Sequence, residues 1–273
     1  MNRRFRVPLL AAALLSAAGC TSHGPAPAAV PAPPKKTLMV VLAHPDDESM
    51  IGPLLAGLAR RGHAVEVLIA TDGKYGTRLP GVVAGDELGA LRRKESECAA
   101  EKLGIPPPKF LGIDRLDTRN GVRQYLDGRK VLLAALERHL AEIDPDALLT
   151  FGPDGEYGHP EHIVVGAAIT ELLLRKGLVD RYPLYYFGWR QEQVADDEEL
   201  GYVDSRYLTT RLGFTDEDER KSFAAAECYA TQFTREEIDE LIARESADET
   251  NSYYFRKLVA PAAEAAAEGF AGW

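Results

Sequence analysis

The stretch Leu38–Glu48 reads LMVVLAHPDDE, and it decides the fold that we expect. Its first six residues, Leu38–Ala43, form an unbroken apolar run, which is typical of a strand that is buried on both faces. Such strands occur in parallel sheets that are covered by helices. The residues directly after the run, His44–Glu48, supply one imidazole and three carboxylic acids. The sequence therefore predicts a polar cluster at the end of a central strand.

Strand and helix patterns alternate from this stretch to residue 188. Further strands are expected at Val65–Ala70, Phe110–Ile113, Ala147–Phe151 and Leu184–Phe187. Helices are expected between them at Met50–Arg61, Asp86–Leu103, Lys130–Ile143 and Glu161–Lys176. The alternation predicts an α/β fold with a parallel, doubly wound sheet and helices on both faces.

The pattern changes in the C-terminal third of the chain. The sequence there predicts helices at Asp216–Gln232 and Arg235–Glu245. It also predicts an edge strand or docking segment at Ser252–Leu258, and a frayed helix over residues 260–268.

The N-terminus has the pattern of a bacterial export signal. Three arginines within the first six residues precede a 12-residue apolar stretch, Val7–Ala18, which is too short to span a bilayer. The sequence Ala17–Cys20 then resembles a lipobox, whose cysteine is lipidated; ordinary signal cleavage beside an incidental cysteine is the alternative. We therefore expect a lipoprotein signal peptide over residues 1–19, lipidation of Cys20, and a Pro/Ala-rich tether over residues 20–36.

These features indicate an exported lipoprotein of the cell envelope, with its folded domain over residues 37–273. Thr21 and Ser22 lack the aspartate that often signals retention in the inner membrane, which favours the outer membrane in a Gram-negative host. The formal net charge of −10 disfavours nucleic acid as a partner. Contact with a membrane would therefore come from the lipid and not from a basic surface.

Two further cysteines, Cys98 and Cys228, leave two alternatives open. They could pair in an oxidising compartment, or they could remain two buried thiols. The chain has no C-x-x-C spacing, so a zinc or redox site made of cysteines is not expected.

A second polar cluster, Tyr157–His162, reads YGHPEH and follows the strand expected at Ala147–Phe151. Ligands of open α/β sheets bind beyond the carboxyl ends of the strands, so the two clusters should meet in one crevice. So many imidazoles and carboxylates would destabilise one another without a cation, and this mixture of ligands suits zinc. A catalytic zinc usually has three protein ligands, which His44, one aspartate of the first cluster and one histidine of the second would supply. The remaining aspartate would then serve as the general base, and the remaining histidine as an oxyanion partner or as the acid.

Residues 37–176 resemble the PIG-L/LmbE-like deacetylases. The chain contains, in the order of that family, the motifs A-H-P-D-D-E, T-D-G, R-x-x-E, L-G and H-P-E-H. They lie at Ala43–Glu48, Thr71–Gly73, Arg92–Glu95, Leu103–Gly104 and His159–His162. Members of the family are zinc-dependent enzymes with a Rossmann-like fold, and many remove acetyl groups from N-acetylglucosaminyl compounds. The resemblance therefore implies a Rossmann-like three-layer fold and one Zn²⁺ per chain.

The resemblance also implies a role for each residue of the two clusters. It makes His44, Asp47 and His162 the zinc ligands, and Asp46 the general base that activates water. His159 would stabilise the oxyanion of the tetrahedral intermediate or protonate the leaving amine.

Four more positions are implied with less specific roles. Tyr157 would polarise the amide carbonyl, and Arg92 and Asp114 would contact the substrate. Glu161, where the family usually has aspartate, would orient a metal-binding histidine, and Glu48 would support the ligands from behind.

The chain departs from the family motifs near its C-terminus. Tyr229–Gln232 stands where many members have H-x-S-Q, so a substrate contact made by that histidine is in doubt, but no zinc ligand is. The part of the chain from residue 189 onward matches poorly.

The sequence thus predicts a zinc-dependent amide hydrolase that removes an acetyl group from an N-acetylglucosamine-type sugar or glycoconjugate. One alternative is an amidase that acts on another N-acyl group or on a thiol conjugate. Another is a non-catalytic glycan-binding lipoprotein of the same fold, although such a protein would have no reason to keep Asp46. A metal phosphoesterase is a third, but it would need a second metal site. The sequence makes no prediction about the oligomeric state.

Overall fold

The computed structural model describes residues 34–194, 201–247 and 250–260. Lys35–Trp273 forms one compact unit, and the fold described below belongs to it. The predicted signal peptide, Cys20 and the tether up to residue 33 lie outside the described residues, as does the predicted helix over 260–268 apart from its first residue. No helix among the described residues is both long enough and apolar enough to cross a membrane.

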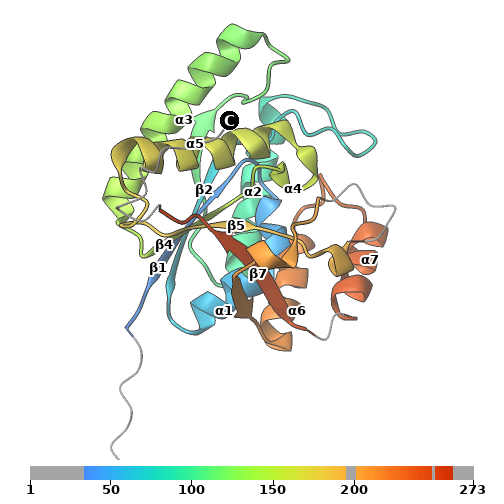
Figure 1. Ribbon diagram of the computed structural model, residues 1–273. Coiled ribbons are helices and arrows are strands. Elements are labelled where there is room, and N and C mark those ends of the chain that lie inside the picture. The colour runs from blue at the N-terminus through green and yellow to red at the C-terminus, as the bar shows by residue number, and fades with distance from the viewer. Residues whose placement is uncertain (1–33, 195–200, 248–249, 261–273) are drawn as a thin grey trace, which may run out of the picture. The chain divides into compact units, whose positions relative to one another are not determined.

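A seven-stranded sheet forms the centre of this unit, in the order β3-β2-β1-β4-β5-β7-β6 (Figure 1). Five strands run parallel: β1 (Thr37–Leu42), β2 (Ala64–Thr71), β3 (Lys109–Ile113), β4 (Ala147–Thr150) and β5 (Leu184–Phe187). The last two continue the sheet in antiparallel pairs: β7 (Ser252–Lys257) and β6 (Thr210–Gly213). The predicted α/β fold with a mostly parallel sheet is confirmed.

Helices lie on both faces of the sheet, as the alternating pattern predicts. Two pack against each other on one side: α3 (Val122–Ile143) and α5 (Pro160–Lys176). Three pack together on the other: α1 (Gly52–Arg60), α2 (Asp86–Leu103) and α6 (Asp216–Ala226). Shorter or more peripheral helices complete the unit: η1 (Asp47–Ile51), α4 (Gly155–Gly158), η2 (Gln191–Gln193), η3 (Ser205–Tyr207) and α7 (Arg235–Glu245).

The central strand β1 is enclosed by this arrangement. Residues 39–43 are fully buried, because helices cover both faces of the strand. Strand β1 pairs with β2 on one side and with β4 on the other, with Leu38 opposite both Val65 and Ala147. The chain leaves β1 toward β2 and β3 and then returns to the other side of β1 as β4. This reversal of direction opens a crevice at the carboxyl ends of β1 and β4, where ligands of such folds bind.

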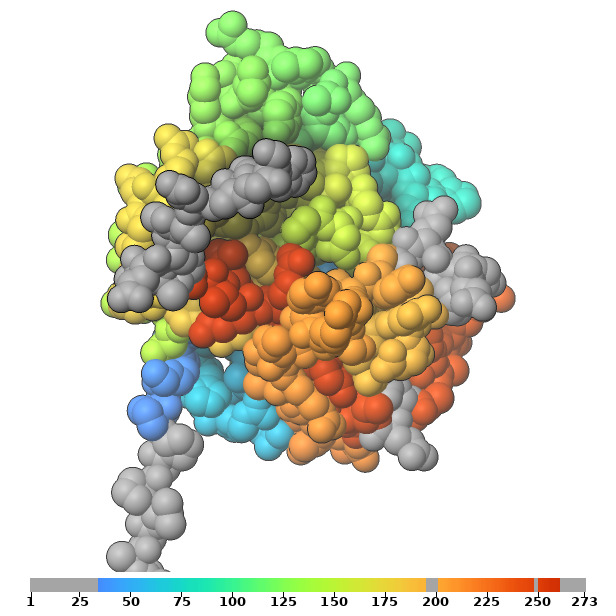
Figure 2. Space-filling view, viewed as in Figure 1, coloured from blue at the N-terminus to red at the C-terminus, as the bar shows by residue number. Residues whose placement is uncertain are grey.

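The C-terminal wall, which we define as residues 216–245, is joined to the first half of the chain by side-chain links. A disulfide connects Cys98 on α2 to Cys228, which settles the alternative that the sequence left open. Asp218 accepts hydrogen bonds of 2.8 and 2.9 Å from Arg60 on α1. Figure 2 shows that these C-terminal residues, coloured orange to red, form one side of the visible face.

Three predictions about the elements need correction. Helix α3 begins at Val122, eight residues before the predicted Lys130. The added turns leave Val122 and Leu126 exposed and contribute no buried residue, so the buried face on which the prediction rested starts only at Leu132. Helix α6 ends at Ala226 and not at Gln232, because the backbone there turns to bring the next side chains onto α2.

The third correction concerns the edge of the sheet. Strand β7 is internal, between β5 and β6. The edge strand on this side of the sheet is Thr210–Gly213, which the sequence analysis missed. That strand has four residues, and the last three are exposed, so it shows no alternation of buried and exposed positions.

Candidate metal centre

The loop after β1 holds the carboxylate of Asp47 in one orientation. Its Oδ2 accepts hydrogen bonds from the backbone N–H groups of Ala43 (2.9 Å) and His44 (2.7 Å). Its Oδ1 then lies 3.2 Å from Nε2 of His162 and 3.6 Å from Nδ1 of His44. One oxygen of Asp47 therefore faces two imidazoles, one from the loop after β1 and one from the first turn of α5 (Pro160–Lys176).

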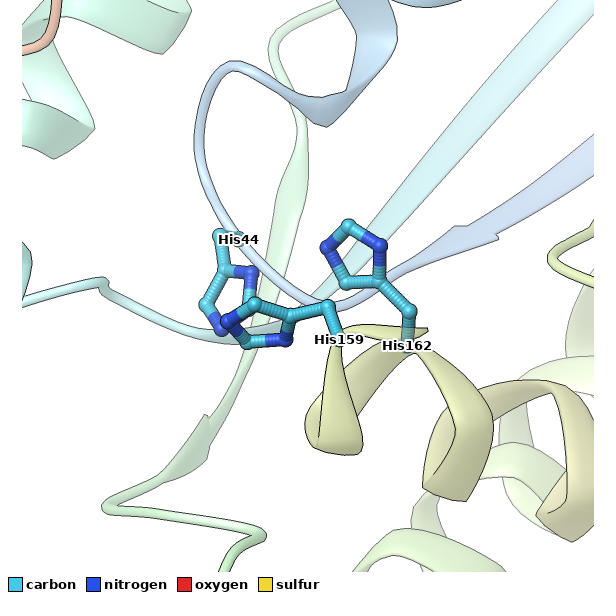
Figure 3. Close-up of side chains that lie close together, drawn as sticks. All are labelled: His44, His159 and His162. Atoms are coloured by element: carbon cyan, nitrogen blue, oxygen red, sulfur yellow. The ribbon is translucent and has the colours of Figure 1, made fainter. Parts of the chain in front are cut away.

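The second cluster enters the crevice at the start of α5. His159 immediately precedes Pro160, and His162 lies in the first turn of the helix, where its ring stacks on Phe151 with the centroids 3.9 Å apart. Figure 3 shows that the imidazoles of His44, His159 and His162 lie close together. One ring nitrogen from each of the three lies within 4.8 Å of the others. The predicted convergence of the two clusters is therefore present.

The donor atoms in this cluster fit a divalent cation. Both ring nitrogens of His162 and the Nδ1 of His159 are buried and form no hydrogen bond of proper geometry with the described residues, although Nε2 of His162 lies 3.2 Å from Oδ1 of Asp47. Buried polar atoms without partners are costly, whereas imidazole nitrogens beside a carboxylate oxygen are the ligand types that zinc prefers. The geometry brings together two possible sets of three ligands: His44 and His162 with Asp47, or with His159.

Glu161 contacts His44 and holds that ring in place. Its Oε2 lies 2.7 Å from Nε2 of His44, and its Oε1 accepts a 2.5 Å hydrogen bond from the backbone N–H of Leu116. Burial would raise the pKa of Glu161, but the contact with His44 outweighs it and lowers that pKa below its usual range. Although burial opposes it, the charges of Asp47 and Glu161 raise the pKa of His44 to about 10. A carboxylate that binds the far nitrogen of a metal-binding histidine fixes the orientation of the ring.

Asp46 stands next to these groups in a strained backbone conformation, with φ at 93°. Its Oδ2 forms a 3.0 Å ion pair with Arg92 on α2. Burial raises the pKa of Asp46 to about 6, although Arg92 opposes the shift. Arg92 also donates hydrogen bonds to the carbonyl oxygens of Gly73 (2.9 Å) and Pro45 (2.6 Å). The guanidinium of Arg92 therefore joins two loops of the site.

His159 and Tyr157 lie at the open side of the cluster. Burial, together with the neighbouring imidazoles of His44 and His162, lowers the pKa of His159 to about 4. Tyr157 is 45% exposed. Partial burial of its ring, together with the negative charge of nearby Asp47, raises the pKa of its hydroxyl. Both groups are therefore neutral near pH 7 and can donate hydrogen bonds.

The two remaining predicted residues lie in different places. Asp114 lines the same cavity as His44 and His159, where it pairs with Lys74 at 2.7 Å and accepts a 3.2 Å hydrogen bond from Tyr75. Glu48 is buried on the other side of the loop and accepts a hydrogen bond from Tyr229. Its burial raises its pKa to about 8. Glu48 therefore links the loop after β1 to the C-terminal wall.

Two residues near the centre were not identified from the sequence. Glu156 has a φ of 72°, and its Oε2 lies 3.7 Å from Nδ1 of His162. Burial, reinforced by Asp47, raises the pKa of Glu156 to about 8. Gln232 lines the cavity and donates a 3.1 Å hydrogen bond to the carbonyl oxygen of Gly76. An acid beside the YGHPEH motif was a visible signal for Glu156, and the glutamine that ends the H-x-S-Q motif was a signal for Gln232.

Comparison with known proteins assigns the chain to a family. Residues 39–173 match the family model described as PIG-L, GlcNAc-PI de-N-acetylase. A 1D-myo-inositol 2-acetamido-2-deoxy-alpha-D-glucopyranoside deacetylase of Saccharomonospora viridis is 30% identical over 233 residues, which are 72% of this chain and 85% of the relative. The chain belongs to the PIG-L family. The deacetylase of the same name from Corynebacterium kroppenstedtii is 35% identical over 158 residues, and this match spans 49% of the chain but 41% of the relative.

Solved structures show the same fold at lower sequence identity. N,N'-diacetylchitobiose deacetylase from Pyrococcus horikoshii superposes with a TM-score of 0.61 at 21% identity, over 82% of this chain and 84% of that protein. GalB, a 4-carboxy-2-hydroxymuconate hydratase from Pseudomonas putida, superposes with a TM-score of 0.57 at 20% identity, over 85% of this chain and all of that protein. Because deacetylases and a hydratase share the fold, the reaction has to be inferred from the site.

Proposed function

We propose that this PIG-L protein is a zinc-dependent N-deacetylase that hydrolyses the acetamide of an N-acetylglucosamine-type sugar or glycoconjugate. The observation that carries the proposal is that three imidazoles and the Asp46–Asp47 pair meet at the carboxyl ends of β1 and β4, where the strand order reverses. The names of the bacterial relatives, which are deacetylases of an acetylglucosaminide of inositol, support this substrate class.

His44, Asp47 and His162 would hold one Zn²⁺ per chain. Asp47 is the ligand that unites the set, because its Oδ1 faces both imidazoles while its Oδ2 is fixed by two backbone N–H groups. Zinc bound here would act as a Lewis acid and lower the pKa of water at the site.

The other residues supply the proton transfers and hydrogen bonds that amide hydrolysis needs. Asp46 binds Arg92 through Oδ2, so its Oδ1 can take the proton of the attacking water. His159, which lies between the ligands and the cavity, donates an N–H to the developing oxyanion. The Tyr157 hydroxyl donates to the same oxygen. The amide C–N bond then breaks, and the proton held on Asp46 passes to the leaving amine.

The cavity beside these groups fits the hydroxyl groups of a sugar. Its volume is about 250 Å³, and its lining includes the polar side chains of Tyr75, Asp114, Arg115, Arg119 and Gln232. Arg115 is buried against the Tyr75 ring and pairs with Asp117 at 2.7 Å, so this wall is held in place. Asp114 and Arg92 are the proposed substrate contacts.

The first experiment measures release of a free amine from N-acetylglucosamine, chitooligomers, peptidoglycan fragments and thiol–sugar conjugates. Purified protein should contain about one zinc per chain, and Asp46→Asn should retain the zinc but lose roughly 10²- to 10⁴-fold in turnover. Asp127→Asn, an exposed position on α3, is the matched control and should match the wild type. Bound zinc without turnover of any amide would favour the glycan-binding alternative, and protein that takes up no zinc would refute the proposal.

We further propose that the protein is an exported lipoprotein anchored through Cys20. The apolar stretch Val7–Ala18 and the small residues before Cys20 support export and lipidation. The Cys98–Cys228 disulfide also supports an oxidising compartment. Mass spectrometry of the protein purified from membranes should find a lipidated N-terminal Cys20, and Cys20→Ala should release the protein into the soluble fraction. An unmodified Cys20 on a protein cleaved elsewhere would refute the anchor.

A further inference from the structure

A second, larger cavity opens on the other side of Asp46 and Asp47. Its volume is about 810 Å³, which is within the range of roughly 300–1,000 Å³ of small-molecule sites. It shares five lining residues with the 250 Å³ cavity: Asp46, Asp47, Arg78, Tyr157 and Gln232. The reacting groups therefore lie where two cavities meet.

The linings of the two cavities differ in chemistry. The smaller cavity presents hydrogen-bonding side chains. The larger one has a wall of aromatic and aliphatic side chains, and its lining also includes charged residues, among them Glu156, Glu240, Arg244 and Glu245. The apolar wall consists of Met50, Trp189, Phe223, Phe233, Ile238 and Leu241. Arg78 at the junction is neutralised by Glu237, with N–O distances of 2.5 and 3.1 Å. An apolar group that enters the larger cavity would thus not be placed beside an unpaired Arg78 guanidinium.

The two halves of an N-acyl sugar match this division. The sugar hydroxyl groups need the partners that line the smaller cavity, so the acyl group on the other side of the amide points toward the larger one. The single methyl group of an acetyl would fill little of an 810 Å³ space. Each additional methylene removed from water would strengthen binding about fourfold.

We propose that the larger cavity binds the acyl chain of the substrate, and that the preferred substrate carries a medium-length saturated N-acyl group. This inference rests on the proposed function and deepens it. Water adds to the acyl carbon, the C–N bond breaks, and the products are a fatty carboxylate and a free amino sugar. The carboxylate leaves through the larger cavity and the amino sugar through the smaller one.

The test compares N-acetyl-, N-butanoyl-, N-hexanoyl- and N-octanoylglucosamine. Each step adds two methylenes, so the value of kcat/KM should rise about 16-fold per step, through a lower KM. Turnover of the N-acetyl substrate with no gain along the series would overturn this inference while leaving the proposed function intact. A gain that follows an alkyl aglycone on the anomeric oxygen, and not the acyl chain, would also overturn it.

Variants of the apolar wall connect the preference to this cavity. Leu241→Glu should remove most of the ratio between octanoyl and acetyl substrates, and the milder Leu241→Ala should lower it several-fold if the charged variant fails to fold. Leu174→Glu on α5, where leucine is 57% exposed, is the matched control and should keep the wild-type ratio. An unchanged ratio in both Leu241 variants would refute the assignment.

A binding measurement tests the larger cavity independently of turnover. The chain has two tryptophans, so Trp273→Phe leaves Trp189 as the only one, in the wall of the larger cavity. Octanoate should shift the Trp189 fluorescence at concentrations where acetate does not. A fluorescence shift in protein that hydrolyses none of the amides would support the acyl-chain site but refute the proposed function. Equal responses to octanoate and acetate would refute the acyl-chain site.

Discussion

The loops after β1 and β4 and the C-terminal wall both border the reacting groups, but they are held in different ways. The loops are fixed from within the parallel part of the sheet, by backbone hydrogen bonds to Asp47, by the Glu161–His44 contact and by stacking of His162 on Phe151. The wall, residues 216–245, is fixed by links to helices that lie more than a hundred positions earlier in the chain. The difference teaches that the chemistry, which the loops carry, and the substrate selectivity, to which the wall contributes, can vary separately. Four experiments test whether the loops and the wall are separable in this way.

The largest expected effect comes from the loop side. His162→Ala removes an imidazole that faces Asp47 at 3.2 Å, so bound zinc and turnover should both be lost. The fall in zinc affinity should exceed the roughly 10- to 100-fold that is typical when a residue hydrogen-bonded to a metal ligand is replaced. His63→Ala, at the opposite end of β2, is the control. Metal analysis and amine release are the measurements, and full zinc content in His162→Ala would remove this residue from the ligand set.

Breaking the disulfide should weaken the whole fold. The bond closes a segment of 130 residues, so Cys98→Ser with Cys228→Ser should lower the free energy of unfolding by up to about 5 kcal/mol on the chain-entropy account. Urea unfolding with and without a reductant measures the change. If the wall and the loops are separable, zinc affinity under native conditions should stay close to wild type, and a parallel loss of zinc would contradict the separation.

The Arg60–Asp218 pair connects α1 to the wall. Arg60 holds the pKa of Asp218 below its usual range, so the ionised carboxylate stabilises the fold above about pH 4, and that contribution is lost as the pH falls toward the lowered pKa. Asp218→Asn should therefore cost about 2–3 kcal/mol of unfolding free energy at pH 7 and less in acid.

Urea unfolding at several pH values measures this cost. Asp239→Asn, whose exposed carboxylate pairs with Arg235 on α7, should change stability by less than about 1 kcal/mol. A cost for Asp218→Asn that does not shrink below pH 4 would show that packing, and not the ion pair, holds this part of the wall.

The smallest expected effect returns to the loops. Glu161→Gln keeps the shape of the side chain but removes the charge that faces His44 at 2.7 Å, so zinc affinity should fall about 10-fold and Tm should change little. Chelator competition measures the affinity, and Glu161→Asp should recover part of it. Unchanged affinity in Glu161→Gln would show that the Glu161 charge does not support His44.

The same contrast explains what the sequence could predict. Helix Asp86–Leu103 and the strands next to β1 were predicted closely, because their apolar periodicity and glycine stops are local. The two polar clusters were also expected to converge, because each directly follows a strand. Tyr229, Gln232 and the edge strand were not foreseen in their places, since distant partners determine them. The 72° φ of Glu156 is likewise imposed by its surroundings and not by the residue type.

Strand β1 starts at Thr37 and ends at Leu42, beside the metal centre. Six residues of strand span about 20 Å, so the chain enters this unit one sheet's height away from the reacting groups. An attachment made at the start of β1 would therefore be one strand length away from the reacting groups. Coupling the protein to a bead or a supported bilayer by that end should preserve access for bulky polymeric ligands, whereas coupling through α7 should block it.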